Sequence, residues 1–320
     1  MQGNGGSRIK LRGSKWFKAI AWTCGLCTGL IVLTFVLLVV GLTHKSSLGL
    51  AFGALVEFGQ KTTLHSSAPV EVPILMPDGS VHINGALNGK PQRFVLDTGA
   101  SAVQLYSKTR TGWFSIKVLH NESVEIVPSI QIGGLVVTSV PVASTNRVIQ
   151  EPLLGDSFFR NIVLTIDYTR MIAQFRPSRS KPPRSDRAIV LPNAARDSLR
   201  WMPITTLNIG GSDMECLIDT GSARSCIDVD AAEFKNVVGE ELKVKGNGAM
   251  GKLDVYTVKH PLSVLAAGRR IGAIRMGIKF PPNVHALIGN DILKNFRVTI
   301  DYPNGITYLE PYGKVDVTGH

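Results

Sequence analysis

The chain has 320 residues, of which 44% are hydrophobic and 18% are charged, and its formal net charge is +11. This composition supplies apolar material for one large or two small domains and excludes a disordered protein. Two segments hold nearly all of the charge, because residues 1–18 and residues 176–200 each contribute a net +5. The rest of the chain is close to neutral, so we expect no nucleic-acid partner.

The basic tail, residues 1–18, is followed by an uncharged apolar segment, residues 19–42. That segment exceeds the roughly 20 residues that span a bilayer as a helix, which predicts a transmembrane anchor. The rule for basic flanks then places the amino terminus in the cytoplasm and the body across the membrane. A cleavable signal peptide is the alternative, but such peptides carry shorter apolar regions. Residues 43–68 are expected to form a tether between the anchor and the body.

The four cysteines form no framework, since Cys24 and Cys27 lie in the apolar segment and only Cys216 and Cys226 lie in the body. The latter two can pair in an oxidising compartment or stay free, and the sequence leaves both states open. Few cysteines and a single glycosylation sequon, at Asn121, favour a bacterial inner membrane with the body facing the periplasm.

The body contains one unit twice. The stretch "LLGDSFFRNIVLTIDY", residues 153–168, aligns without gaps with "LIGNDILKNFRVTIDY", residues 287–302. Upstream, "RFVLDTGAS" has its counterpart in "ECLIDTGSA", and a turn-forming glycine precedes each Asp by eight residues, Gly89 and Gly211. Several landmarks repeated in the same order indicate a duplication.

The duplication divides the body into two β-rich lobes, residues 69–178 and 200–313. Between them, residues 179–199 are basic and proline-rich, which is typical of an exposed linker. Residues 314–320 form a tail. Short helices are expected directly after each repeated glycine, in "DSFFRN" and "NDILKN".

In each unit an apolar strand enters Asp-Thr-Gly, and a motif of two apolar residues and glycine ("LLG", "LIG") follows later. With these motifs each unit resembles a lobe of the retropepsin-like, or retroviral-type, aspartic peptidases, and the resemblance covers residues 69–313. It implies a mostly β fold with two tandem retropepsin-like acid-protease lobes that form an intramolecular pseudo-dimer, preceded by one transmembrane helix. The pepsin-like relatives fit less well because these lobes are short.

The resemblance implies an aspartic endopeptidase in which Asp97 and Asp219 meet in one cleft. Two adjacent carboxyls share a proton, so one can activate a water for attack on a peptide carbonyl while the other donates a proton. No metal or cofactor is needed, and the partner is a peptide or protein substrate. The resemblance assigns support of the catalytic loops to Thr98, Gly99, Ala100, Thr220, Gly221 and Ser222, and packing behind them to Leu154, Gly155, Ile288 and Gly289. Thr98 and Thr220 are expected to bond across the lobe interface.

The two motifs differ at one position, because Ala100 follows the first and Ser222 the second. A hydroxyl at Ser222 could donate to Asp219 and stabilise its anion. We therefore predict Asp219 as the preferred anion and Asp97 as the preferred acid.

A substrate-covering hairpin, or flap, is predicted in the second unit at Gly246, Gly248, Met250 and Gly251, with a plain glycine-rich loop as the alternative. The first unit could turn at "TGWF" or "HNES" or lack a flap. Trp113 is assigned either to substrate contact or to the core, and Arg224 either to a subsite or to the surface. Retroviral lobes carry Arg after the glycine of the later motif, where this chain has Asp156 and Asn290, so the lobes must be tied by other contacts.

Other functions fit less well. Ser157 in "GDSF" imitates an esterase nucleophile, but its repeat has Asp291 at that position and no histidine is placed as a base. A pseudo-protease module that binds peptides without cutting them is the main alternative, although such a module needs no acid–base pair. In a third alternative the lobes pair with those of another chain, and the oligomeric state is left open.

Overall fold

The computed structural model describes residues 61–64, 69–106, 114–119, 122–145, 151–177, 185–194, 202–248, 251–279 and 284–313. Its internal contacts divide the chain into Met1–Ala51 and Phe52–His320, and every described residue belongs to the second unit. The predicted basic tail, anchor and carboxyl-terminal tail therefore lie outside the described residues. Within the described ranges, no helix has the length and hydropathy needed to cross a membrane.

The described residues are mostly β and form a 14-stranded and a 7-stranded sheet. The first predicted lobe contributes β2 (Val70–Leu75), β3 (His82–Leu87), β4 (Lys90–Leu96), β5 (Val103–Tyr106), β6 (Phe114–Leu119), β7 (Glu122–Ile132), β8 (Leu135–Thr145), β9 (Leu153–Leu154), α3 (Asp156–Phe159), β10 (Ile162–Asp167) and β11 (Ile172–Pro177).

The second half of the body contributes β12 (Ile189–Pro192), β13 (Ile204–Ile209), β14 (Ser212–Ile218), β15 (Cys226–Asp228), the 3-10 helix η2 (Ala232–Phe234), β16 (Val238–Gly248), β17 (Gly251–Ala266), β18 (Arg269–Ile278), β19 (Ala286–Ile288), α4 (Asn290–Leu293), β20 (Phe296–Asp301) and β21 (Ile306–Pro311). The short helices α3 and α4 begin directly after the repeated glycines, as the sequence predicts.

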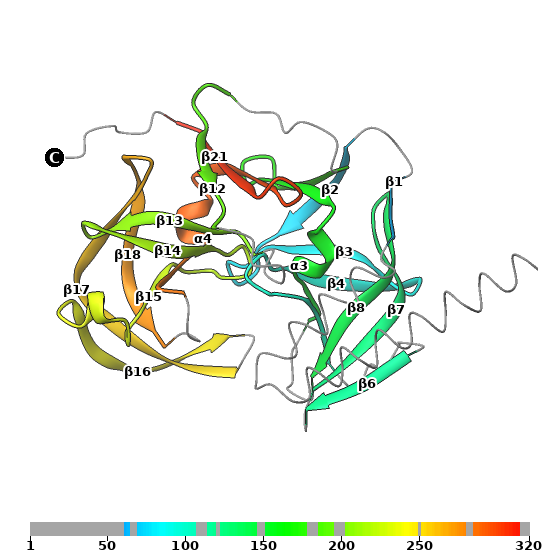
Figure 1. The fold of residues 1–320 in the computed structure, drawn as a ribbon, viewed down its shortest axis with the longest axis horizontal. Helices are drawn as coiled ribbons and strands as arrows, with labels where there is room; N and C mark the ends of the chain where they lie inside the picture. The colour runs from blue at the N-terminus through cyan, green and yellow to red at the C-terminus, as the bar shows by residue number, and fades with distance from the viewer. Residues whose placement is uncertain are drawn as a thin grey trace, which may run out of the picture. The chain divides into compact units, whose positions relative to one another are not determined.

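The two halves repeat the same strand pairings. The hairpin of β3 and β4 corresponds to that of β13 and β14, and the parallel pair β4–β9 corresponds to β14–β19. The three-stranded groups β6–β7–β8 and β16–β17–β18 also correspond, and Figure 1 shows the strands of each group side by side. The predicted duplication is thus present in the hydrogen bonding of the strands.

Glycine turns set the registers of the two hairpins. Asn88 and Gly89 join β3 to β4 with φ of 50° and 77°, and Gly210 and Gly211 join β13 to β14 with φ of 58° and 99°. Two successive positive φ values produce the tight turn whose twist matches paired strands, and glycine adopts them without a steric penalty. Each of these turns starts the strand that ends in Asp-Thr-Gly.

The halves are joined by a shared sheet in the order β12-β21-β20-β10-β11-β2, which forms one end of the 14-stranded sheet. At its centre β10 of the first lobe pairs antiparallel with β20 of the second, with Thr165 opposite Thr299. The hydroxyls of these two equivalent threonines lie 2.9 Å apart and share a hydrogen bond. The predicted pairing of the lobes within one chain therefore includes continuous backbone pairing.

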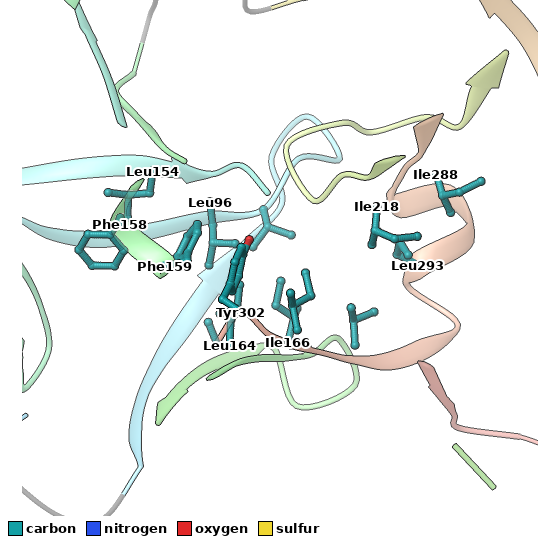
Figure 2. Close-up of a cluster of buried hydrophobic side chains, with 14 of the residues drawn as sticks. Leu96, Leu154, Phe158, Phe159, Leu164, Ile166, Ile218, Ile288, Leu293 and Tyr302 are labelled. Carbon is teal, nitrogen blue, oxygen red and sulfur yellow. The ribbon is translucent and has the colours of Figure 1, made fainter. Parts of the chain in front are cut away.

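Buried side chains from both halves pack between this shared sheet and the two lobes. Figure 2 shows Leu154, Phe158 and Phe159 from the first lobe, Ile218, Ile288 and Leu293 from the second, and Leu164, Ile166 and Tyr302 from the shared sheet. Tyr302 is almost wholly buried and stacks on Phe159 with ring centroids 5.4 Å apart. Because Phe159 and Tyr302 come from different halves, this core holds the halves together.

Two predicted connecting segments contain strands. β1 (Lys61–Leu64) lies in the predicted tether and pairs with β8. β12 lies in the predicted linker 179–199, where Ile189 and Leu191 are buried and the strand pairs with β21. The prediction of an exposed linker is wrong for these residues, because alternating apolar side chains outweigh the basic and proline-rich composition around them. β12 corresponds to β2, so the second lobe begins earlier than residue 200.

Candidate active site

The two aspartates of the Asp-Thr-Gly motifs stand at the carboxyl ends of β4 and β14, directly after the buried Leu96 and Ile218 of Figure 2. Each is held from behind by the later repeated motif. The N–H of Asp97 donates to the carbonyl of Leu154 at 3.0 Å, and that of Asp219 donates to the carbonyl of Ile288 at 2.9 Å. The strands β9 and β19 thus fix the backbone position of each aspartate at the end of its strand.

The glycines after those strands are close to the catalytic loops. A Cβ at Gly155 would lie 2.6 Å from the carbonyl oxygen of Ala100, and a Cβ at Gly289 would lie 2.9 Å from that of Ser222. The following N–H groups then donate to the same two carbonyls, from Asp156 at 2.8 Å and from Asn290 at 2.9 Å. A side chain at either glycine would push its loop away, which explains the glycine in both repeats.

A reciprocal threonine lock joins the two loops. The hydroxyl of Thr98 donates to the carbonyl of Ile218 at 2.7 Å, and the hydroxyl of Thr220 donates to the carbonyl of Leu96 at 2.6 Å. Each hydroxyl also accepts the backbone N–H of the opposite threonine, at 3.0 and 3.3 Å. Both threonines are fully buried, so this lock is the cross-lobe contact that the resemblance leads us to expect.

The lock brings the two carboxyls together. A Cβ at Gly99 would lie 2.6 Å from Oδ2 of Asp219, and a Cβ at Gly221 would lie 2.7 Å from Oδ1 of Asp97. Each carboxyl therefore lies against the glycine of the opposite loop, while its own loop glycine donates an N–H to it at 2.9 Å in the first lobe and 2.8 Å in the second. Only glycine leaves the space for this arrangement.

Burial and proximity change the protonation of this pair. Burial raises the pKa of Asp97 well above its ordinary value, and the charge of Asp219 and the hydrogen bond between the two carboxyls add to the rise. Burial also raises the pKa of Asp219, but the hydrogen bond from Asp97 and the N–H groups of Gly221, Gly99 and Ser222 oppose that rise. Two such carboxyls cannot both ionise readily, so the pair retains a shared proton.

The proposed cause of this asymmetry needs correction. The hydroxyl of Ser222 donates to the carbonyl of Arg224 at 2.9 Å, so its single proton is not directed at Asp219. The backbone N–H groups distinguish the carboxyls instead, because Asp219 receives that of Gly99 from the opposite loop in addition to two from its own. The expected contact from Ser222 is absent, and the assignment of Asp97 as the acid and Asp219 as the anion stays a prediction.

Asn290 supplies the cross-lobe contact that the sequence could not name. Its Nδ2 donates to the carbonyls of Thr220 and Gly79, both at 2.8 Å, and its Oδ1 accepts the hydroxyl of Tyr168 at 2.7 Å. Gly79 and Tyr168 belong to the first half, and Val81 also donates its N–H to the carbonyl of Thr220 at 3.1 Å. The catalytic loop of the second lobe is thus braced from the first lobe.

In the other direction, Tyr302 and Asp156 stand at the positions equivalent to Tyr168 and Asn290. Tyr302 occupies in the second repeat the place that Tyr168 has in the first, and the charge of Asp156, after burial, contributes to a raised pKa of the Tyr302 phenol. Both tyrosines end a "TIDY" stretch, which is the one sequence signal that could have identified them. Their partners could not be read from the sequence because they lie on the opposite lobe.

Both lobes carry the hairpin expected of a flap. In the second, β16 and β17 pair up to Gly248 opposite Gly251, so Gly246, Gly248 and Gly251 lie in or beside a hairpin end, while Met250 lies outside the described residues. In the first, β6 and β7 pair up to Leu119 opposite Glu122, and residues 120–121 of the predicted "HNES" turn lie outside the described residues. Trp113 lies outside the described residues, and Arg224 is exposed.

Ser157 and the two cysteines of the body lie in buried, packed surroundings. The Oγ of Ser157 accepts the N–H of Val103 and faces the carbonyl of Pro141, which fits a packing role. Cys216 and Cys226 are buried free thiols on β14 and β15, which lie on either side of β19. Two strand spacings separate their backbones by about 10 Å, too far for a disulfide. Within the described ranges, no three His, Cys, Asp or Glu side chains form a group that could hold a metal.

Comparisons with known proteins leave the family open. No family model matches the chain, and no curated protein matches it. Among solved structures it is similar to an aspartic proteinase from Irpex lacteus, with 13% sequence identity, 79% of this chain and 99% of that chain covered, and a TM-score of 0.48. A likeness at this level does not assign a family, so the function depends on the geometry of the site itself.

Proposed function

We propose that the chain is an aspartic endopeptidase with two retropepsin-like lobes, in which Asp97 and Asp219 hydrolyse a peptide bond with an activated water. The observation that carries the proposal is the pair of buried carboxyls, one from each repeat, held together by the Thr98–Thr220 lock. A binding module would gain nothing from burying two acids against each other, because that arrangement costs free energy unless a proton is shared.

The chemistry follows from the asymmetry of the pair. Asp219, with more N–H donors, is the carboxylate that takes a proton from the attacking water. Asp97, with the higher pKa, donates its proton toward the carbonyl oxygen as charge develops there. Asp219 then gives the proton it has taken to the leaving amine, so the two residues exchange their acid and base roles. In this proposal the substrate peptide binds in extended form beside the two carboxyls.

The test is cleavage of a peptide library by the full chain in detergent between pH 3 and 7. We expect cleavage that a statine-type inhibitor blocks, and a loss of about 10²- to 10⁴-fold in both Asp97→Asn and Asp219→Asn. Asp213→Asn is the matched control, since Asp213 is exposed on the same strand, β14, as the residues before Asp219. Activity that survives either active-site change would disprove the shared mechanism. Binding of peptides without cleavage would favour the pseudo-protease alternative.

We propose in addition that residues 19–42 anchor the chain in a membrane, with residues 1–18 in the cytoplasm and the body in the periplasm. The support is the length of the uncharged segment and the basic residues before it. Fractionation and protease protection of cells that express the full chain test both claims. Recovery of the chain in the soluble fraction, or with a processed amino terminus, would favour the signal-peptide alternative.

A further inference from the structure

The first lobe contains a chain of ionisable side chains around His82, and the second lobe has the apolar Ile204 at the position of that histidine. His82, on β3, is 4% exposed. Its Nε2 lies 3.0 Å from Oδ1 of Asp78, and its Nδ1 lies 2.8 Å from Oε2 of Glu151. The guanidinium of Arg93, on β4, pairs with the other oxygen of Glu151. The buried ring is therefore enclosed by two carboxylates.

Each ring nitrogen of His82 faces a carboxyl oxygen. An ionised carboxylate accepts hydrogen bonds but cannot donate them. A neutral imidazole carries one N–H, so one of its nitrogens would present a lone pair to a carboxylate. Only the imidazolium donates to both partners. Burial alone would raise the pKa values of Asp78 and Glu151, yet both are lowered, with His82 among the causes in each case. The geometry fits the charged ring.

The charged groups that face this ring are few. On the strands beside β3, the residues paired with His82 are Leu75 of β2 and Val95 of β4, which are both apolar. Asp78 and Glu151 supply the negative charges, and Arg93 acts on the ring only through Glu151. The carboxylates of Asp78 and Glu151, from two different segments, thus balance the charge of an imidazolium at this position.

The loop held by His82 reaches the candidate active site. We call residues 76–81 the clasp loop. Asp78 accepts the N–H of Ser80 at 2.9 Å as well as facing His82, so the imidazole fixes the loop at its middle. The carbonyl of Gly79 accepts Nδ2 of Asn290, and the N–H of Val81 donates to the carbonyl of Thr220. The clasp loop is therefore a second first-lobe contact of the loop that carries Asp219, in addition to the threonine lock.

The other carboxylate connects to the first catalytic loop. Glu151 lies two residues before β9, whose Leu154 carbonyl accepts the N–H of Asp97. One charged imidazole consequently links the segment behind Asp97 with the loop that braces the Asp219 loop. In the second lobe the equivalent position is Ile204, which pairs with Leu217 as His82 pairs with Val95. The repeat thus folds with an apolar residue here, so the histidine is not required by the fold.

We propose that His82 is a positioning residue whose charge controls how firmly the clasp loop holds the Asp219 loop. When the ring is charged, both carboxylates are bound and the clasp loop is fixed. A neutral ring can donate only one of the two hydrogen bonds, so the clasp loop is held less firmly when the ring is neutral. The lobes then support the Asp97–Asp219 pair less well. The consequence for catalysis depends on the proposed function, but the loosening does not.

Hydrogen exchange of the full chain tests this directly. Peptides that cover the clasp loop and the start of β3 are followed at pH 5.5 and pH 8, with rates corrected for the intrinsic pH dependence of exchange. We expect about tenfold faster corrected exchange at the higher pH, since a hydrogen bond to a charged group is lost. The same increase is expected in Asp97→Asn, so the result stands apart from any peptidase activity.

The variants separate a charge effect from packing. His82→Gln should exchange at the same corrected rate at both pH values, whereas His260→Gln, which changes an exposed histidine of β17, should behave like the unmodified chain. If His82→Gln does not fold, Asp78→Asn decides, because the Asp78 side chain is 62% exposed and its loss is tolerable. Asp78→Asn should shrink the pH effect. Equal corrected exchange at both pH values in the unmodified chain, or an undiminished effect in Asp78→Asn, would overturn the proposal.

Discussion

The two lobes repeat their strands, turns and catalytic loops, but they differ in what surrounds each aspartate. In both, a glycine turn begins the strand, a parallel neighbour holds the Asp backbone, and a threonine reaches across to the other loop. The Asp219 loop alone is braced by Asn290 and by the clasp loop of the first lobe. The repeat thus places one acid in each lobe, and the contacts around the two acids differ.

The largest loss of peptide cleavage should come from changing the loop glycines, which the two lobes share. Gly99→Ala and Gly221→Ala would each place a methyl carbon 2.4 to 2.9 Å from the atoms of the opposite carboxyl group, so the two acids can no longer meet. We expect each change to lower peptide cleavage by about 10²-fold or more, comparable to losing an acid–base group. Cleavage assays at saturating substrate measure this. Gly134→Ala, whose Cβ would meet only ordinary contact at 3.6 Å, should retain activity.

The asymmetric brace should matter less. Asn290→Asp replaces the Nδ2 donor by an oxygen that faces the carbonyls of Thr220 and Gly79. Losing buried hydrogen bonds of this kind costs about 1–3 kcal/mol, so we expect a roughly tenfold or greater loss of kcat with a smaller change in KM. Asn295→Asp is the control, since its amide bonds only within the α4 region. Equal kcat values for both variants would contradict a role for the brace.

The protonation of the pair predicts an effect on stability. The pKa of Asp97 is raised, so the folded chain binds more protons than the unfolded chain and stability falls as the pH rises through that pKa. Asn at position 97 takes part in no such proton linkage, so Asp97→Asn should raise Tm by a few degrees at pH 7 and by less at pH 4. Thermal unfolding at both values decides the sign. A rise in Tm over the unmodified chain that is no larger at pH 7 than at pH 4 would contradict the prediction.

The smallest effect is expected at the one position where the motifs differ. The Ser222 hydroxyl donates to the carbonyl of Arg224, so Ser222→Ala should leave the acidic limb of the pH–rate profile unmoved and change the rate less than about twofold. The fitted values belong to the pair of acids rather than to either one. A shift of the acidic limb to higher pH would restore the sequence-based explanation of the asymmetry.

The sequence predicts the features that depend on repeated, local patterns. The Asp-Thr-Gly loops, the glycine turns at Gly89 and Gly211 and the helices α3 and α4 all follow from short motifs that occur twice. Such features are determined within one unit, so a duplicated pattern is enough to find them.

Apart from the Thr98–Thr220 lock, which the resemblance implies, the contacts between the lobes could not be predicted. Asn290 binds Gly79, which is 211 residues away, and β10 pairs with β20 through backbone groups that carry no sequence signal. Ser222 was assigned the wrong acceptor because the choice between Asp219 and the carbonyl of Arg224 depends on the exact shape of the loop. β12 was missed because its alternation covers only four residues within a basic segment.

Mixing two inactive chains tests the central claim, that one chain holds one complete site made by its two halves. Asp97→Asn and Asp219→Asn are prepared separately, combined in equal amounts, and assayed for cleavage beside the unmodified chain. The backbone pairing of β10 with β20 within one chain predicts that the mixture stays as inactive as its components while the unmodified chain cleaves. Recovery of cleavage in the mixture would show that the lobes pair between chains and would contradict the account.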